Sequence, residues 1–133
     1  MFYHLVGKLS RIEEAKVLLE DLHEKLPDLQ DMAIARTNGL VILSLQKTIG
    51  QDKKSERLLG GMASALFSIS KRAASELLKG DFISLNCEVS TGSLFLVFTG
   101  KVILICLTNK EPNLGLISLE LEDAAKKLNK IFE

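Results

Sequence analysis

A long uncharged segment, residues 58–70 (LLGGMASALFSIS), lies inside a stretch whose spacing predicts one helix ending near residue 79. A helix on the surface of a monomeric protein has an apolar stripe and a polar back, and this segment has no polar side. It is shorter than the roughly 17–25 apolar residues that span a bilayer. We therefore expect one side to cover the chain's own core and another to contact a second protein. The segment favours a binding or assembly module over a self-contained enzyme.

Length and composition predict a single domain over residues 1–133, in which residues 1–9 either extend the domain or begin its first helix. The 17 Lys and Arg residues balance the 17 Asp and Glu residues, which disfavours a nucleic-acid partner. No segment has the pattern of a signal peptide or the length of a membrane span, so we expect a cytoplasmic protein without direct membrane insertion. Cys87 and Cys106 lie in apolar runs and are predicted to be buried, reduced thiols.

Hydrophobic spacing predicts the element order α-β-β-α-β-β-β-α. An amphipathic first helix ends at Pro27, and the triplet Thr37-Asn38-Gly39 is typical of a tight type I′ hairpin turn. The predicted strands are 32–36, 40–46, 82–89, 94–99 and 102–108. The last two are apolar without interruption, so both of their faces should be covered. The fold class is therefore α+β, with one five-stranded antiparallel sheet and helices on both of its faces.

The sequence also predicts where the second helix begins and ends, and which side of the first and last helices is buried. Residues 50–55 form a polar link into the second helix, and Gly80 is placed to be the left-handed residue after that helix. The apolar stripe of the first helix is Leu5, Leu9, Ile12, Leu19, Leu22 and Leu26, with Ala15 and Leu18 widening it. The stripe of the last helix is Ile117, Leu121, Ala124, Ala125, Leu128 and Ile131.

No pattern of a catalytic, cofactor or metal site emerges. Gly60-Gly61 lies inside a helix rather than between a strand and a helix, where a nucleotide loop would be. Neither His4 nor His23 has a Cys or second His at metal-ligand spacing. The carboxylate cluster of Glu120, Glu122 and Asp123 is ordinary compensation of a helix dipole. We expect no enzyme activity, no cofactor and no metal.

The second helix divides into three strips on a helical wheel. The strip expected to cover the sheet is Leu58, Leu59, Met62, Leu66, Ile69, Ala73 and Leu77. The second strip holds the small residues Gly61, Ser64, Ala65, Ser68 and Ser75, with Arg72 among them, and all of these except Ser75 are expected in a dimer interface. The third strip holds Gly60, Ala63, Phe67, Ala74 and Leu78, with Lys71 at its edge, and it would expose Phe67 as a contact site.

The strand 82–89 should lie at one edge of the sheet. Its flat face is polar, with Ser84, Asn86 and Glu88, and it has no proline to block pairing. Such an edge pairs readily with a second copy of itself. We therefore predict a symmetric homodimer in which Ser84, Asn86 and Glu88 and the small-residue strip contribute to the interface.

The element order and several local sequences resemble the roadblock/dynein light-chain family. The matching segments are 37–42 (TNGLVI), 59–63 (LGGMA), and 113–116 (NLGL) leading into 119–125 (LELEDAA). The resemblance extends from about residue 10 to residue 132. The family often has an acidic residue in the first hairpin, and this chain has Arg36 and Thr37 there. This departure does not affect the expected fold, but it leaves the identity of the partner open.

This resemblance implies a profilin-like roadblock fold with one sheet continued across a dimer. It also implies a non-catalytic scaffold or regulator that binds a small Ras-like GTPase and stimulates GTP hydrolysis, if at all, by ordering the GTPase's own residues. The GTPase-facing residues it implies are Gly60, Ala63, Phe67, Ser70, Lys71 and Ala74. A heterodimer with a related chain, a small-molecule sensor of PAS or GAF type, and a structural light chain of a larger assembly remain alternatives.

Overall fold

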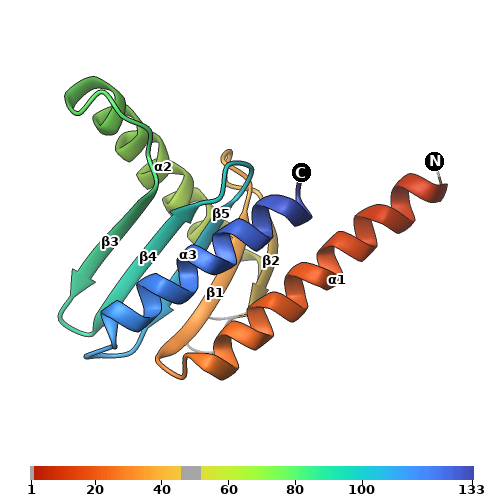
Figure 1. The fold of residues 1–133 in the computed structure, drawn as a ribbon, viewed down its shortest axis with the longest axis horizontal. Helices are drawn as coiled ribbons and strands as arrows, with labels where there is room; N and C mark the ends of the chain where they lie inside the picture. The colour runs from red at the N-terminus through yellow and green to blue at the C-terminus, as the bar shows by residue number, and fades with distance from the viewer. Residues whose placement is uncertain (1, 46–51) are drawn as a thin grey trace.

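The described residues form three helices and five strands in the predicted order (Figure 1). The computed structural model describes residues 2–45 and 52–133, and in the first helix it places the side chains from Ser10 onward. The elements are α1 (Phe2–Lys25), β1 (Leu29–Ala35), β2 (Val41–Leu45), α2 (Lys53–Leu77), β3 (Ser84–Val89), β4 (Gly92–Phe98), β5 (Ile103–Thr108) and α3 (Leu114–Ile131). Gln46, predicted to end the second strand, and residues 50–51 of the predicted link lie outside the described residues.

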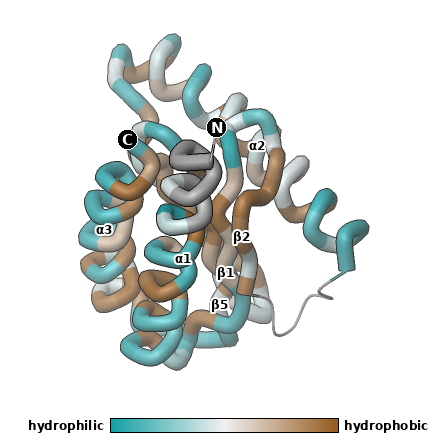
Figure 2. Tube along the Cα trace, turned by 90° about the vertical axis from the view of Figure 1, so that its right-hand side faces the viewer, coloured by the Kyte–Doolittle hydropathy of each residue, from teal (hydrophilic) through white to brown (hydrophobic). Residues whose placement is uncertain are grey.

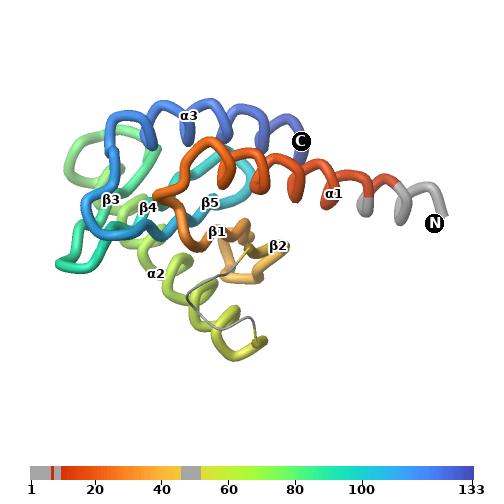
Figure 3. The backbone as a smooth tube through the Cα atoms, turned by 90° about the horizontal axis from the view of Figure 1, so that it is seen from below, coloured from red at the N-terminus to blue at the C-terminus, as the bar shows by residue number. Residues whose placement is uncertain are grey.

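The five strands form one antiparallel sheet in the order β2-β1-β5-β4-β3. Pairing of β1 with β5, in which Ile34 is opposite Leu104, joins the first hairpin to the three-stranded meander. Helices α1 and α3 lie on one face of the sheet and α2 lies on the other (Figure 3). This arrangement confirms the prediction of one sheet with helices on both faces, and it explains why β4 and β5 are apolar on both sides.

Each face of the sheet has its own apolar core. The larger core lies under α1 and α3 and includes Leu19 and Leu121. The smaller core lies under α2 and includes Phe67 and Ile105. A helix is about 10 Å wide and strands are about 4.8 Å apart, so one helix covers roughly two strands. The single helix α2 therefore leaves part of its face of the sheet without a covering element.

The stripe predicted for α1 is confirmed from residue 15 onward, because Ala15, Leu19, Leu22 and Leu26 are buried. The helix ends at Lys25, just before Pro27, and it begins at Phe2, so residues 2–9 continue it. The side chains of Leu5 and Leu9 lie outside the described ones. Figure 2 shows hydrophilic and hydrophobic residues alternating along α1 and α3, as expected for helices buried on one side. For α3, the buried residues are Ile117, Leu121, Ala124 and Leu128, as predicted.

The first hairpin differs from the predicted type I′ turn. Only Gly39 has a positive φ, of 96°, whereas a type I′ turn needs positive φ at both central residues. The Gly39 N–H donates to the Arg36 carbonyl at 2.9 Å, and the Arg36 N–H donates to the Leu40 carbonyl at 2.8 Å. This is a three-residue hairpin loop, in which a type I turn is followed by a left-handed glycine that forms a bulge. The Asn38 side chain accepts from the Leu40 N–H at 3.1 Å.

Both ends of α2 have identifiable caps. Asp52 caps the N-terminus by accepting from the Ser55 N–H at 2.7 Å. At the other end the left-handed residue is Lys79, with φ 58°, and not Gly80 as predicted. The Gly80 N–H instead donates to the Ala74 carbonyl at 3.1 Å. A lysine in this conformation costs about 1–2 kcal/mol relative to glycine.

One carboxylate joins the turn after α1 to the loop before α3. The Asp28 carboxylate accepts from the Asn109 side chain and from the Asn113 N–H, both at 3.0 Å. The Asn113 backbone hydrogen bond, followed by the Asn109 side-chain bond, holds the pKa of Asp28 below its usual value. Asn113 in turn caps α3 by accepting from the Leu116 N–H at 3.2 Å. The start of α3 is thus fixed relative to the end of α1.

Candidate protein interface

Helix α2 meets the sheet with a different side from the one predicted. The predicted covering residues Leu58, Met62 and Ile69 are 63%, 59% and 68% exposed. The buried residues of α2 are Gly60, Ala63 and Phe67. The prediction that the large aliphatic strip covers the sheet is therefore wrong for these three residues, whereas Leu59 and Leu66 of the same strip are half-buried and pack against the core under α2.

The physical reason is a close approach between α2 and the first hairpin. A Cβ atom on Gly60 would lie 2.2 Å from the Gly39 carbonyl oxygen and 2.9 Å from a methyl group of Val41. Only a residue without a side chain fits there, so the glycine determines which side of the helix is buried. Gly61 has no atom within 4 Å of an added Cβ. The two adjacent glycines therefore have different surroundings.

Phe67 is the centre of a small aromatic cluster and is only 5% exposed. Its ring lies 5.7 Å from Phe82 in an edge-on arrangement and 4.9 Å from Phe98. The Lys71 ammonium lies 5.8 Å from the Phe67 ring centre. The expectation of an exposed Phe67 is therefore wrong, because the ring belongs to the core between α2 and the sheet.

This result divides the residues that the family resemblance assigned to GTPase binding. Gly60, Ala63 and Phe67 are buried against the chain's own sheet. Ser70 and Ala74 are half-buried, and Lys71 is exposed. No continuous contact surface can form from this set.

An apolar stripe on α2 points away from the sheet instead. It consists of Leu58, Met62, Ala65 and Ile69, which follow helical spacing and are all exposed; we call it the outer stripe. Singly scattered apolar residues on a surface need no explanation, but a stripe of this kind marks an interaction site. The outer stripe is the apolar surface of the uncharged segment that the chain's own sheet does not cover.

The α2 residues predicted for a dimer interface are mostly exposed. Gly61, Ala65 and Ser68 are exposed, and Arg72 forms an exposed ion pair with Glu76 at 3.0 Å. Ser64 is half-buried and donates to the Thr37 carbonyl at 2.6 Å. Ser64 thus faces the first hairpin of its own chain, and the interface role of the others stays a prediction.

Strand β3 lies at the edge of the sheet, as predicted, and pairs only with β4 among the described strands. Ser84, Asn86 and Glu88 are exposed, and Leu85 is its one half-buried residue. Ser84 and Asn86 stand opposite Val97 and Phe95 of β4 and share the face that carries α3. The predicted interface residues of β3 and α2 therefore lie on opposite faces of the sheet, with the free backbone edge of β3 between them.

The two cysteines differ in surroundings. Cys106 is fully buried, and desolvation raises the pKa of its thiol to about 12. Cys87 is exposed on β3, so the prediction that both thiols are buried is wrong for Cys87. An edge strand with one uncovered face exposes residues that look apolar in the sequence.

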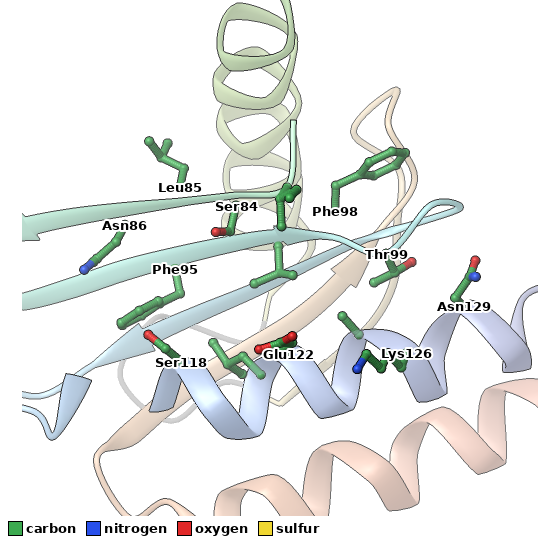
Figure 4. A pocket seen from close by; sticks show the side chains of 14 residues that line it. Ser84, Leu85, Asn86, Phe95, Phe98, Thr99, Ser118, Glu122, Lys126 and Asn129 are labelled. Atoms are coloured by element: carbon green, nitrogen blue, oxygen red, sulfur yellow. The ribbon is translucent and has the colours of Figure 1, made fainter. Parts of the chain in front are cut away.

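An apolar hollow between β3, β4 and α3 was not found from the sequence; we call it the β3–α3 groove (Figure 4). Its volume is about 420 Å³. Phe95, Val97 and Leu121 form its apolar floor, and they are 5%, 7% and 1% exposed. Polar side chains surround this floor: Ser84, Asn86, Thr99, Ser118, Glu122, Lys126 and Asn129. The groove exists because small polar residues of β3 face α3, so no large side chain fills the space above the edge strand.

The described residues show no arrangement suited to metal chemistry. No cluster of three His, Cys, Asp or Glu side chains occurs in residues 10–45 and 52–133 that could hold a metal ion. No helix in the described part of the chain combines the length and the apolar character needed to cross a bilayer. The arrangement offers surfaces for binding: the outer stripe, the β3 edge and the β3–α3 groove.

Comparison with solved structures shows which fold this is. The gliding protein MglB from Thermus thermophilus superposes with a TM-score of 0.80 at 15% identity, covering 92% of this chain and 90% of MglB. A Roadblock/LC7 domain from Streptomyces avermitilis superposes with a TM-score of 0.76 at 22% identity, covering 85% and 92%. Profilin IA from Acanthamoeba castellanii gives a TM-score of 0.54 at 17% identity, covering 78% and 87%. The chain has the profilin-like roadblock fold, as the sequence resemblance predicted.

Comparison of sequences gives relatives of similar length. No model of a known protein family matches the chain. The uncharacterized proteins MJ1340 and MJ0310 of Methanocaldococcus jannaschii are each 33% identical over 118 residues, covering 88% of this chain and 97% of theirs. The chain belongs to the same family as these two archaeal proteins, and that family has the roadblock fold.

Proposed function

We propose that the chain is a non-catalytic regulator or scaffold that binds a small Ras-like GTPase as a homodimer. The roadblock family, which the sequence resembles, includes regulators of such GTPases, and the fold agrees with that resemblance. The observation that carries the proposal is the outer stripe, in which Leu58, Met62 and Ile69 are each more than half exposed. Apolar side chains aligned along a helix are costly in water and become stable when a partner covers them.

The dimer forms through the backbone edge of β3. This edge has one hydrogen-bonded neighbour, β4, and carries no proline and a single charged residue, Glu88. Such an edge adds another strand readily, and a second copy related by a two-fold axis supplies an identical strand in antiparallel orientation. One sheet then continues across both protomers.

The GTPase binds to the outer stripes, which replace the surface inferred from the family resemblance. The stripe residues lie on the side of α2 away from the sheet, opposite Gly60, Ala63 and Phe67. In a β3-paired dimer both α2 helices lie on the same face of the continuous sheet, so two stripes are presented together. The GTPase supplies its own catalytic residues, and this chain orders them by contact.

Met62→Asp tests this assignment, because it places a charge in the middle of the outer stripe without touching the core. The probe is the purified Ras-like GTPase encoded nearest to this chain on its genome, loaded with a non-hydrolysable GTP analogue. We expect Met62→Asp to weaken binding at least about tenfold, which corresponds to about 1.4 kcal/mol, and to leave the dimer intact. Ser10→Asp, on the exposed surface of α1, is the matched control and should bind as wild type. Equal binding by Met62→Asp and wild type would remove the outer stripe from the proposal.

A small-molecule sensor is the second candidate, and the β3–α3 groove is the observation that favours it. Its volume of about 420 Å³ falls within the range of about 300–1,000 Å³ typical of ligand sites. A metabolite that binds there should raise the melting temperature of wild type and have no effect on Asn86→Trp, in which an indole fills the groove. A panel of metabolites without any shift would argue against this candidate.

A further inference from the structure

We propose that the outer stripe selects a partner surface that has an apolar centre and carboxylates along one side of it. The inference rests on the proposed function, because it takes the outer stripe as the surface that the GTPase covers, and it adds the chemistry of the GTPase's contact surface. It requires neither the dimer nor any pairing of two β3 strands.

The two faces of the sheet differ in charge, although the chain as a whole is neutral. Helix α2 carries five Lys or Arg residues and two Glu residues, so its net charge is +3. The part of α1 from Ser10 to Lys25 carries three Lys or Arg and five Asp or Glu residues, and α3 carries three of each. Helices α1 and α3 lie on the face opposite α2 (Figure 3), so the excess positive charge is on the side of the molecule that presents the outer stripe.

The cations of α2 gather on one flank of the outer stripe. Arg57, Ser64 and Lys71 are seven residues apart, so they lie along one side of the helix. The Ser64 hydroxyl donates to the Thr37 carbonyl at 2.6 Å, which places this side next to the first hairpin. Two lysines extend it, one turn before Arg57 and one turn before the start of the outer stripe. We call the four exposed cations the basic flank: Lys53, Lys54, Arg57 and Lys71.

The carboxylates of α2 and its N-cap do not neutralise the basic flank, because each is already bonded within the chain. Asp52 caps the helix, and Glu56 accepts from the Ser44 hydroxyl at 3.3 Å. Glu76 pairs with Arg72 at 3.0 Å. Among the described contacts, no carboxylate lies within ion-pair distance of the basic flank. These cations therefore complement carboxylates supplied by another molecule.

The other flank of the outer stripe is uncharged, since Leu59, Leu66 and Ala73 lie there. The stripe from Leu58 to Ile69 is about 17 Å long at about 1.5 Å per residue. A complementary partner needs an apolar patch of that length, with carboxylates along only one of its long sides. An apolar stripe alone would accept a partner in two opposite directions, and charge on one side selects one of them.

An anionic membrane is the other kind of surface that attracts a basic helix, and the outer stripe is less suited to it. A helix that lies in a membrane surface has large residues such as Trp, Phe and Leu on its apolar side. The outer stripe has no aromatic residue, and its third member is the small Ala65. The apolar side of α2 that does contain an aromatic ring, at Phe67, is buried against the sheet. These features favour a protein surface.

The test uses two labelled synthetic peptides of about 18 residues with the same amphipathic helical spacing, one built from Leu and Glu and the other from Leu and Lys. We expect wild type to bind the acidic peptide at least about tenfold more tightly than the basic one. This preference should fall as salt rises, because the Debye length shrinks from about 10 Å at 0.1 M to about 3 Å at 1 M. Met62→Asp should weaken the acidic peptide at every salt concentration.

Charge reversal on the basic flank locates the effect. Lys71→Glu and Lys54→Glu should each weaken the acidic peptide about fivefold at low salt and have no effect near 1 M salt. Lys16→Glu, the same change on the exposed surface of α1, should bind as wild type. With the GTPase as the probe, Lys71→Glu should slow association about fivefold and leave dissociation unchanged, as expected for a charge at the rim of an interface.

The outcomes separate this inference from the proposed function. Equal binding of the two peptides to wild type, or equal losses in Lys71→Glu and Lys16→Glu, would overturn the acidic surface. GTPase binding that depends on Met62 but not on salt or on Lys71 would also overturn it and leave the GTPase proposal standing. A chain that prefers the acidic peptide and does not bind the GTPase would support the inference and contradict the proposed function. Binding to phosphatidylserine vesicles without any preference between the peptides would assign the surface to a membrane and refute the inference.

Discussion

Replacing each of the two adjacent glycines of α2 by alanine should have opposite effects. Alanine is favoured over glycine in a helix interior by about 1 kcal/mol, and this gain is the same at both positions. At Gly60 the new Cβ would lie 2.2 Å from the Gly39 carbonyl oxygen, so α2 and the hairpin must separate by about 1 Å. Overpacking costs about 1–3 kcal/mol, and a backbone oxygen that cannot rotate away places this site near the upper end. We expect Gly60→Ala to lower the free energy of unfolding by about 2 kcal/mol.

Gly61→Ala is the matched variant, because an added Cβ there has no atom within 4 Å. It should raise the free energy of unfolding by about 0.5–1 kcal/mol. With an m-value of about 1–3 kcal/mol/M, the urea midpoints of the two variants should differ by about 1–3 M. Unfolding is followed by circular dichroism at two protein concentrations, so that dissociation is separated from unfolding. Changes of the same sign in both variants would refute the close approach of α2 to the hairpin.

Four further outcomes follow from the structure. Phe67→Ala should destabilise the fold by about 3–5 kcal/mol in urea denaturation, because the ring is buried among two other aromatic rings; a loss under about 1 kcal/mol would contradict its place in the core. Lys79→Gly should stabilise by about 1 kcal/mol in the same assay, since it removes a side chain from a left-handed conformation; destabilisation would contradict that geometry. The lowered pKa of Asp28 means that its stabilising effect is present above its unfolded pKa near 3.8 and is lost as pH falls through the folded value. Stability of wild type relative to Asp28→Asn should therefore shrink below about pH 4, and an unchanged difference would refute the link. Under native conditions a maleimide should modify Cys87 and spare Cys106, whose pKa is about 12; mass spectrometry of peptides shows which thiol reacts, and labelling of Cys106 would contradict its burial.

Local patterns predicted most of the fold correctly. The stripes of α1 and α3 were identified because each helix has one apolar side and one charged side, as at Leu19 and Leu121. The meander was predicted from short turns between apolar runs. The pairing of β1 with β5 could not be read in the same way, because residues such as Ile34 and Leu104 are brought together by the whole chain.

The α2 helix shows where such patterns fail. Hydropathy predicts that the side of α2 with the largest aliphatic residues faces the sheet. Because the uncharged segment of α2 has no polar side, nothing in the pattern indicates which side faces solvent. The orientation depends on a backbone contact between Gly60 and Gly39, which only the folded hairpin creates. The exposed side therefore carries Leu58 and Ile69, and the predicted GTPase contact Phe67 is buried. The β3–α3 groove was missed for a related reason, since it lies between elements and leaves no repeat in the sequence.

Pairing of two copies through β3 is the claim on which the proposed homodimer depends, and cross-linking at Cys87 tests it directly. Cys87 lies near the middle of β3, and side chains opposite each other on antiparallel strands have Cβ atoms about 4.5–5.5 Å apart. A short bifunctional maleimide should therefore join two wild-type chains at low micromolar concentration, and Cys87→Ser should give no product because Cys106 is buried. Wild-type protein that yields no covalent dimer under these conditions, and sediments as a single chain, would contradict the account.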